Sequence, residues 1–418
     1  MRFQDVCAAA GDRCTTCANG VVIYSRPAPG PAAALGVWLE NGVRDEGILE
    51  NGYAHLMEHL LFKNAAGLDA AGLARAFEAM GGQVNAYTGR EHMVLHGFVP
   101  AADVYRLAEL FAAMLAQPGF SDADVRVERE VVLQEMAMIR EDPEEAMADQ
   151  AVLAAWAGHP MSRPILGTPE IVQAAQGEEL RRYVRAVVRG GRLAIVAAGA
   201  VDHDRLVDAL GALQQLAAGG RTAVPAPVFR SGGAQLQGAV SQTHMLWLMP
   251  GPALTDTSEA DYAVANHVLG GGASSRLFLE VRERLGLAYD IQTRLEAYED
   301  AGLWSIETAC AADQADRCRQ AVYQVIEHWT ARGITPDELE IARRHLLASV
   351  ILEDGDPRIV CDRLARDLLA RGAVWSDRER RQRIQAVQPT KLASLLQEAW
   401  ACRYSLVWDP ECAQAGGP

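Results

Sequence analysis

An internal repeat constrains the fold of this chain more than any other feature of its sequence. Residues 119–133 and 333–347 each begin with a glycine, an apolar residue and a hydroxyl residue, Ser121 or Thr335, of the kind that caps a helix N-terminus. Acidic residues follow in the expected first turn, and apolar residues then recur at helical spacing. Both segments predict the same long helix, once in each half of the chain.

A second match extends the repeat toward the start of each half. Val37-Trp38-Leu39 resembles Leu246-Trp247-Leu248 and predicts one strand in each copy. Between the halves, residues 217–233 are rich in glycine and proline, which favour a connecting segment. We therefore expect an N-terminal domain at residues 1–217 and a homologous C-terminal domain at residues 234–418.

Strand-like runs and long helices are grouped along the chain rather than strictly alternating. In the first half the strand candidates are Gly20–Ser25, Ala33–Leu39, Met93–Val99 and Leu193–Ala198. The helix candidates there are Tyr53–Lys63, Ala70–Ala79, Val104–Ala116, Asp122–Arg140 and Glu145–Ala157. The grouping favours an α+β fold of two homologous α/β-sandwich-like domains, each a largely antiparallel sheet packed with helices.

Residues 55–59, His-Leu-Met-Glu-His, carry the clearest chemical signal. Histidines four residues apart lie one above the other on a helix face and can bind one metal ion. Glu58 projects to the same side, where it suits a general base beside a metal-bound water. This order inverts the His-Glu-x-x-His signature and is associated with inverzincin peptidases.

A metal held by two histidines needs a third protein ligand and an open position for water. On the predicted helix 122–140, Glu128 and Glu135 lie two turns apart on one face, whereas Glu130 points elsewhere. Spacing alone leaves Glu128 and Glu135 as alternatives. In the second half, the counterparts of His55, His59, Glu128 and Glu135 are Val264, Val268, Ala342 and Ser349. The second copy keeps the helices and lacks the metal-binding groups.

These residues resemble the pitrilysin/insulysin family of inverzincin zinc peptidases, which includes mitochondrial processing peptidase. The similarity covers nearly the whole chain and is closest to the two-domain bacterial type. By this resemblance, Glu135 lies at the family's spacing from His59 and is the third ligand to Zn²⁺. Glu128 matches the family's second acidic residue, which supports the catalytic site without binding the metal.

The resemblance also implies residues that contact substrate. Residues 81–88 match the family segment after the metal helix, and the glycine-rich loop starting at Leu269 matches one in the second domain. The substrate-binding residues expected there are Asn85, Ala86, Gly271 and Gly272. Arg282 and Tyr289 match a family pair that contacts substrate and helps stabilise the oxyanion.

The function implied is that of a zinc metalloendopeptidase that hydrolyses peptides or small unfolded proteins. Because larger family members enclose substrate between two half-shells, a two-domain chain is expected to form a homodimer, or a heterodimer with a related subunit. Two alternatives stay open. One is a non-catalytic core, scaffold or peptide-binding subunit, and the other is a peptidase that processes a ribosomally made precursor such as that of pyrroloquinoline quinone.

Composition narrows the class of partner and the compartment. The net charge of −15 argues against nucleic acid, and no apolar run approaches the length of a membrane span. The first residues lack the pattern of a secretory signal, so a cytoplasmic location is expected. The 8 cysteines are scattered and form no disulfide framework. Cys14 and Cys17, with Cys7 nearby, form a C-x-x-C whose role the sequence leaves open.

Overall fold

The computed structural model describes residues 11–190, 192–217 and 223–411, which form two compact units. Unit 1 comprises Met1–Met138, Arg163–Pro225 and Leu352–Ser376, and unit 2 comprises Ile139–Ser162, Ala226–Ile351 and Asp377–Pro418. Each half of the chain therefore contributes one internal segment to the unit that the other half mainly builds. Residues 218–222 of the expected connecting segment, and Cys7, lie outside the described residues.

Unit 1 is built on a six-stranded sheet in the order β1-β2-β8-β3-β7-β6. Its strands are β1 (Arg13–Thr16), β2 (Val22–Pro27), β3 (Ala32–Leu39), β6 (Gln83–Thr88), β7 (Met93–Pro100) and β8 (Leu193–Gly199). The β2–β8 pair is parallel and the other pairs are antiparallel. A small ribbon of β4 (Asn64–Ala65) and β5 (Leu68–Asp69) lies apart from this sheet.

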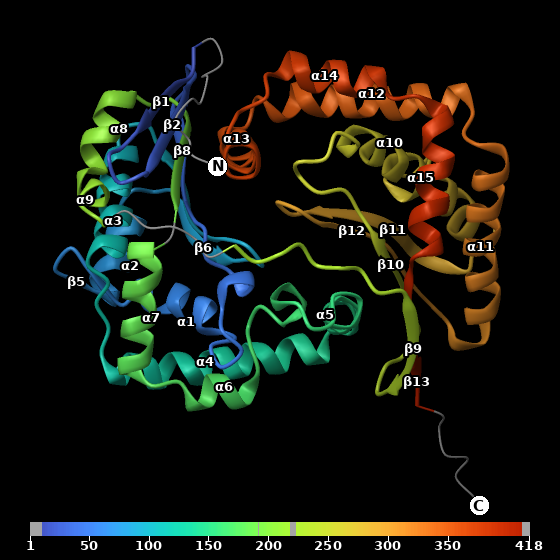
Figure 1. Ribbon diagram of the computed structural model, residues 1–418, viewed down its shortest axis with the longest axis horizontal. Helices are drawn as coiled ribbons and strands as arrows, with labels where there is room; N and C mark the ends of the chain where they lie inside the picture. The colour runs from blue at the N-terminus through green and yellow to red at the C-terminus, as the bar shows by residue number, and fades with distance from the viewer. Residues whose placement is uncertain (1–10, 191, 218–222, 412–418) are drawn as a thin grey trace, which may run out of the picture. The chain divides into compact units, whose positions relative to one another are not determined.

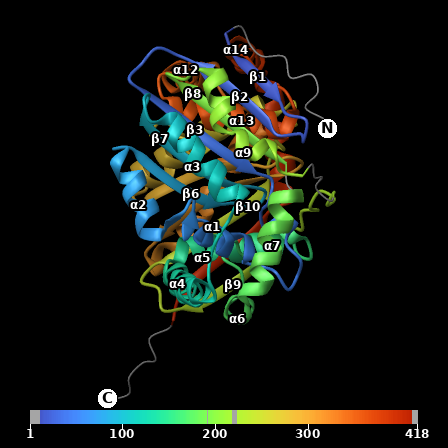
Figure 2. The ribbon, with the colours of Figure 1, turned by 90° about the vertical axis from the view of Figure 1, so that its left-hand side faces the viewer.

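The two faces of this sheet bury separate apolar clusters, as alternation along a strand requires. On one face Leu35, Val37 and Leu39 pack with the helices that Figure 2 shows in front of the sheet. These helices are α1 (Tyr53–Leu61), α2 (Ala70–Ala79), α3 (Val104–Ala116), α4 (Asp122–Glu141), α6 (Pro169–Ala174), α7 (Gly177–Gly190), α8 (His203–Ala209) and α9 (Gly211–Gln214). On the other face, Ala34 and Trp38 pack against α13 (Pro357–Arg371).

Unit 2 repeats this architecture. Its five-stranded sheet has the order β11-β12-β10-β13-β9, and only the β13–β9 pair is parallel. The strands are β9 (Gly232–Gly238), β10 (Thr243–Pro250), β11 (Ala288–Ala297), β12 (Gly302–Cys310) and β13 (Tyr404–Pro410). This is the order of unit 1 without β1, with the parallel pair in the same place. The prediction of two homologous α+β domains with largely antiparallel sheets is confirmed.

Helices cover both faces of the second sheet as well. One face packs against α10 (Glu259–Gly270), a π-helix at Phe278–Arg284, α11 (Ala315–Arg332), α12 (Pro336–Glu353) and α15 (Pro389–Ala401). α14 (Asp377–Ala386) contacts α10. The remaining segments are single 3-10 turns at Val43–Asp45, Pro160–Ser162 and Ala312–Gln314. Within the described residues, no helix combines the length and the apolar character that a membrane span requires.

Two helices are exchanged between the halves of the chain (Figure 1). α5 (Pro143–Ala155) comes from the first half and packs against β10 and β13 of unit 2. α13 comes from the second half and packs against β3 and β8 of unit 1. In the repeat these helices hold the same place, following α4 and α12 respectively. Each sheet therefore depends on a helix from the other half of the chain to cover its second face.

Candidate metal centre

The helix that carries the pentad begins in an unusual way. Gly52, its N-cap, has a φ of 100° and no side chain, so it offers no oxygen to the free backbone N–H groups of α1. The buried carboxylate of Glu46 takes that role and accepts hydrogen bonds from Gly52 N at 3.1 Å and Ala54 N at 2.8 Å. Burial raises the pKa of Glu46 to about 7, although the donors Asn51, Ala54 and Gly52 oppose the shift.

The segment that follows α5 fixes this start in place. A Cβ on Gly52 would lie 2.6 Å from Leu166 O, and one on Gly167, whose φ is 86°, would lie 2.3 Å from Asn51 O. Asn51 Nδ2 donates to Pro164 O at 3.0 Å. Glycine is thus required at both positions, by the backbone conformation and by the close approach of these two segments of the chain. The position of the metal helix is set by residues more than a hundred positions away in the sequence.

His55, His59 and Glu135 come together on α1 and α4. Their ligand atoms all lie within 4.8 Å of one another. Glu135 Oε2 lies 3.1 Å from His55 Nε2 and 3.7 Å from His59 Nε2. Ligands about 2.0–2.1 Å from a tetrahedral zinc ion are about 3.3 Å apart, so these separations fit such an ion with small shifts. The half-exposed Glu135 side chain leaves that side open to water or substrate.

Glu58 lies beside this group and is held by Thr88 of strand β6. Its Oε2 atom accepts a hydrogen bond from Thr88 Oγ1 at 2.6 Å and is 3.5 Å from His55 Nδ1. Burial raises the pKa of Glu58, but the contacts with His55 and Thr88 outweigh it and the net shift is downward. Burial likewise lowers the pKa of His55, and Glu58 and Glu135 reverse that shift. Glu58 is therefore ionised at neutral pH and able to accept a proton.

Glu128 does not face the open side of the group. It is 5% exposed, and its Oε2 accepts from His59 Nδ1 at 2.7 Å while its Oε1 pairs with Lys63 Nζ at 2.5 Å. This contact leaves His59 Nε2 free to face Glu135. A carboxylate on the far nitrogen of a histidine ligand fixes the ring orientation and raises its basicity. The geometry thus places Glu135 beside both histidines and Glu128 behind His59, whereas spacing alone left the two glutamates as alternatives.

Three supporting residues escaped the sequence-based prediction: Glu46, Lys63 and Thr88. Lys63 follows His59 by four residues, just beyond the end of α1, and the acidic face of the predicted helix 122–140 could have suggested its pairing with Glu128. Thr88 contacts Glu58 from strand β6, and Glu46 contacts the start of α1 from a loop. No local pattern marks such contacts, because tertiary packing alone brings the groups together.

The residues expected near substrate in unit 1 lie on β6, an edge strand. Asn85 is exposed on the face that also bears His96, its partner on β7. The Ala86 side chain is 7% exposed and packs in the core, so Ala86 offers only backbone groups to a ligand. Among the described residues β6 pairs with β7 alone, which leaves its outer edge available to an extended chain.

The expected residues of unit 2 lie around the end of α10 and the start of β11. A Cβ on Gly271 would meet His267 Cα at 2.7 Å, so this position needs glycine, whereas Gly272 has more space. The Arg282 guanidinium lies 5.1 Å from the Tyr289 ring centre, and the ring is 85% exposed. The structure brings the Arg–Tyr pair together and presents its aromatic ring to solvent.

The C-x-x-C pair does not form a site of its own. Cys14 packs with the cluster beneath α13, whereas Cys17 packs with the cluster on the opposite face of the sheet. Burial raises the pKa of both thiols, to about 11 for Cys14. Both are thiols in the structure, and their packing suits a structural role.

Comparison with known proteins agrees with this geometry. The family model "Insulinase (Peptidase family M16)" matches residues 21–169, and the model "Peptidase M16 inactive domain" matches residues 174–346. An uncharacterised zinc protease of Mycobacterium tuberculosis is 32% identical over 416 residues, which cover 96% of this chain and 93% of that protein. The beta subunit of mitochondrial-processing peptidase from Dictyostelium discoideum is 26% identical, with 86% of this chain and 80% of that protein covered.

Solved structures share the fold over nearly the whole chain. A protease from Helicobacter pylori superposes with a TM-score of 0.88 at 18% identity, covering 96% of this chain and 99% of that one. At that identity the likeness concerns the fold alone, while the family rests on the sequence relatives. The chain therefore belongs to the insulinase family of peptidases, peptidase family M16.

Proposed function

We propose that this protein is a zinc-dependent endopeptidase, with Zn²⁺ held by His55, His59 and Glu135. The observation that carries the proposal is the convergence of these three ligand atoms within 4.8 Å beside the carboxylate of Glu58. The relatives named as zinc proteases support the choice of metal. Two imidazoles and one carboxylate form the ligand set of catalytic zinc sites, which keep a fourth position open.

Different residues of the chain contribute to different steps of peptide hydrolysis. Zinc at this site supplies a Lewis acid that lowers the pKa of water and polarises a carbonyl oxygen. Glu58 Oε2 accepts the proton of the attacking water and returns it to the leaving amide nitrogen. Thr88 holds this carboxylate in position, and Glu128 holds His59. The free edge of β6 pairs with an extended peptide and presents its scissile bond.

Arg282 and Tyr289 supply donors for the oxyanion and for substrate, by analogy with the family. We propose that the chain works as a homodimer or with a related subunit, so that unit 2 of one chain serves the zinc of its partner. The match to a mitochondrial-processing peptidase subunit supports pairing with a related chain. The exposed Tyr289 ring is available for such contacts.

Substitution of the base tests the chemistry directly. Glu58→Gln removes the proton acceptor and keeps the shape, so the protein should retain about one zinc per chain and lose peptide cleavage by at least about 100-fold. Glu130→Gln is the matched control, because Glu130 is exposed and outside the metal centre. Cleavage by Glu58→Gln at the wild-type rate would disprove the assigned role of Glu58.

Mixed dimers test sharing between chains. Inactive His55→Ala protein and inactive Arg282→Ala protein are mixed under conditions of subunit exchange, and peptide cleavage is followed. If unit 2 serves the partner's zinc, one intact site forms in each mixed dimer and activity returns. Verified mixed dimers without activity would contradict sharing between chains: either one chain supplies the whole site, or Arg282 is not part of the site.

The main alternative is a non-catalytic subunit that binds peptides or supports an assembly. The complete set of metal ligands, the ionised base and its support by Thr88 favour the enzyme over this alternative. Zinc content and chelator-sensitive cleavage distinguish the two. Processing of a ribosomally made precursor would use the same chemistry on a narrower substrate, and a precursor peptide cleaved at one bond would identify it.

A further inference from the structure

Two histidines of unit 2 lie against each other. The rings of His267 on α10 and His345 on α12 are stacked, with their centres 4.3 Å apart and their planes 22° from parallel. Within the parts of the chain that the structure describes, neither ring makes a hydrogen bond or an ion pair. His267 is half-buried and His345 is exposed. Adjacent imidazoles whose nitrogens have no protein partner are able to bind a metal ion.

The pair lies on the two helices of unit 2 that correspond to the metal-binding helices of unit 1. By the alignment of the two copies, His267 is the counterpart of Glu58 and His345 is the counterpart of Val131. Unit 2 has apolar or hydroxyl residues at the positions equivalent to the three metal ligands, and its two imidazoles come from other positions on the same helix pair. An ion bound by this pair would therefore not repeat the geometry of the metal centre.

The two rings are as close as those of a metal-binding pair. The rings of His55 and His59, the proposed zinc ligands, have their centres 4.7 Å apart, against 4.3 Å for His267 and His345. The pairs differ in orientation, since the planes of the first pair are 67° apart. Rotation of a histidine ring about its Cβ–Cγ bond has broad minima, and the exposed ring of His345 has room to turn. One nitrogen of each ring can then face a common ion at about 2.0–2.1 Å.

The chemistry of the pair selects the class of ion. Burial and the neighbouring His345 both lower the pKa of His267, so its ring is neutral at neutral pH, the form that binds a metal. Imidazole nitrogen suits Zn²⁺, Cu²⁺ and Ni²⁺, whereas Mg²⁺ and Ca²⁺ prefer oxygen. Among the described residues, the one group of three potential ligand atoms close enough to hold an ion is His55, His59 and Glu135. An ion on the histidine pair would therefore keep water at its other positions and bind more weakly than at the metal centre.

The glycine-rich loop lies directly against this pair. Gly271 N donates to His267 O at 3.3 Å, and a Cβ on Gly272 would lie 3.6 Å from Cε1 of the His267 ring. The loop therefore leaves α10 within one helical turn of the proposed ligand. An ion bound by His267 and His345 would join the end of α10 to α12 and would restrict the movement of the loop beside it.

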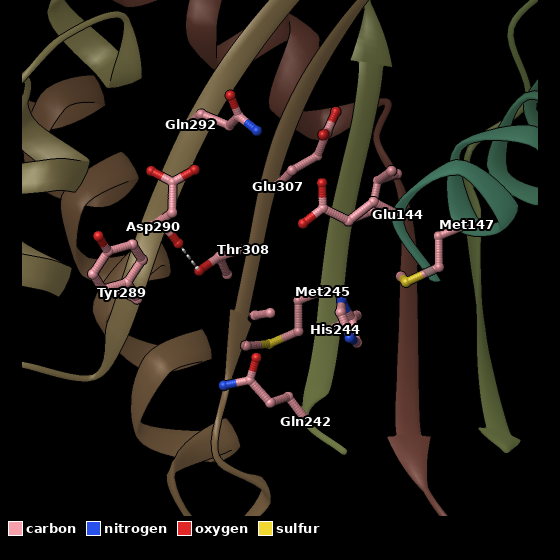
Figure 3. Close-up of a pocket in the computed structure, with 12 residues that line it drawn as sticks. Glu144, Met147, Gln242, His244, Met245, Tyr289, Asp290, Gln292, Glu307 and Thr308 are labelled. Carbon is pink, nitrogen blue, oxygen red and sulfur yellow. Dashed lines mark hydrogen bonds between the residues drawn. The ribbon is translucent and has the colours of Figure 1, made fainter. Parts of the chain in front are cut away.

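A second place in unit 2 where a cation could collect is a pocket of about 170 Å³ (Figure 3). Its carboxylates Glu144, Asp290 and Glu307 come from three different elements, and its one histidine is His244. These four residues do not bring three ligand atoms within 4.8 Å of one another. The pocket thus offers a single imidazole, and an ion that prefers nitrogen is better served by the histidine pair.

We propose that His267 and His345 bind a second divalent transition-metal ion, Zn²⁺ in the first instance, each through one ring nitrogen. The ion joins α10 to α12 and stabilises the start of the glycine-rich loop. This site adds to the proposed peptidase chemistry and does not depend on it, because its ligands and those of the metal centre are different residues.

Equilibrium dialysis of the full-length protein against increasing free Zn²⁺ at neutral pH tests the site. We expect the wild-type protein to bind about two zinc ions per chain, one tightly at the metal centre and one in a weaker phase. His345→Asn should weaken the second phase by at least about tenfold, because even a group that only supports a ligand contributes that much. His345→Cys supplies a thiolate ligand and should keep the second phase. Since His345 is exposed, both variants should fold normally, which circular dichroism checks.

Three control variants locate each ion. His244→Asn in the pocket and His328→Asn at an exposed position on α11 should leave both phases unchanged, whereas His55→Ala should remove the tight phase alone. The second ion should also raise the melting temperature of the wild-type protein and not that of His345→Asn. A wild-type protein that binds only one zinc, or a second phase that persists in both His267→Asn and His345→Asn, would overturn the proposal. A tight phase that persists in His55→Ala would instead contradict the metal centre and leave this site standing.

Discussion

Replacing Thr88 by valine tests how the general base is positioned. The Thr88 hydroxyl donates to Glu58 Oε2 at 2.6 Å, and the Glu58 side chain is 14% exposed. Hydrogen bonds to charged groups contribute about 1.5–3 kcal/mol when little water can replace them. Without this bond the carboxylate can leave its reactive position, and returning it there in the transition state costs about this free energy. The loss should therefore lower kcat by about 10- to 100-fold, since about 1.4 kcal/mol is a factor of ten.

The assay can separate positioning from folding and from metal binding. Valine has the shape of threonine and an equal preference for strands, so β6 should keep its pairing with β7. Cleavage of a fluorogenic peptide gives kcat and KM, and zinc content is measured on the same preparation. Thr88→Ser keeps a hydroxyl and should recover most of the rate. A Thr88→Val protein with wild-type kcat, or one that has lost its zinc, would refute this role.

Three further predictions concern the metal and acid stability. Glu128→Gln should weaken zinc binding by about 10- to 100-fold in competition with a chelator, because His59 loses its charged partner. Removal of zinc should lower the melting temperature and re-addition should restore it, since the ion binds only the folded chain. Burial raises the pKa of Glu338, but its two hydrogen bonds from Arg276 and those from Thr335 outweigh this and lower that pKa to about 2. Because the folded pKa is below the unfolded one, this stabilisation is present above about pH 4.5 and is lost as the pH falls toward 2. Arg276→Gln should therefore cost about 1–2 kcal/mol in urea unfolding at pH 7, and the deficit should shrink at pH 3.

Local pattern predicted much of the fold because the helices here are long and regular. The predicted limits Ala70–Ala79 and Val104–Ala116 are those of α2 and α3, and the caps expected at Ser121 and Thr335 are present. Each of these two hydroxyls accepts a hydrogen bond from the backbone N–H three residues later. The carboxylate at that later position, Asp124 or Glu338, accepts in turn from the backbone N–H of the capping residue. Such features depend on neighbours in sequence, so the sequence alone contains them.

The exchange of α5 and α13 could not be predicted in the same way. The apolar residues of Glu145–Ala157 indicate a helix with a buried face, and they do not say which sheet that face covers. The two sheets offer similar apolar surfaces, since they are copies of one design. The choice depends on the path of the chain after α4 and α12, which is a property of the tertiary structure.

The two copies also show why the polar groups of the metal centre are present. Burying His55 and Glu128 costs free energy unless they are paired, and their partners must be buried with them. At the corresponding helices of unit 2, Val264, Val268 and Ala342 pack in the core with no such cost. The fold is therefore compatible with apolar residues at this helix pair, and the stability of the folded state does not explain the polar residues found in unit 1. The proposed metal binding and catalysis do explain these polar residues, and the contacts of Lys63 and Thr88 stabilise them in the folded protein.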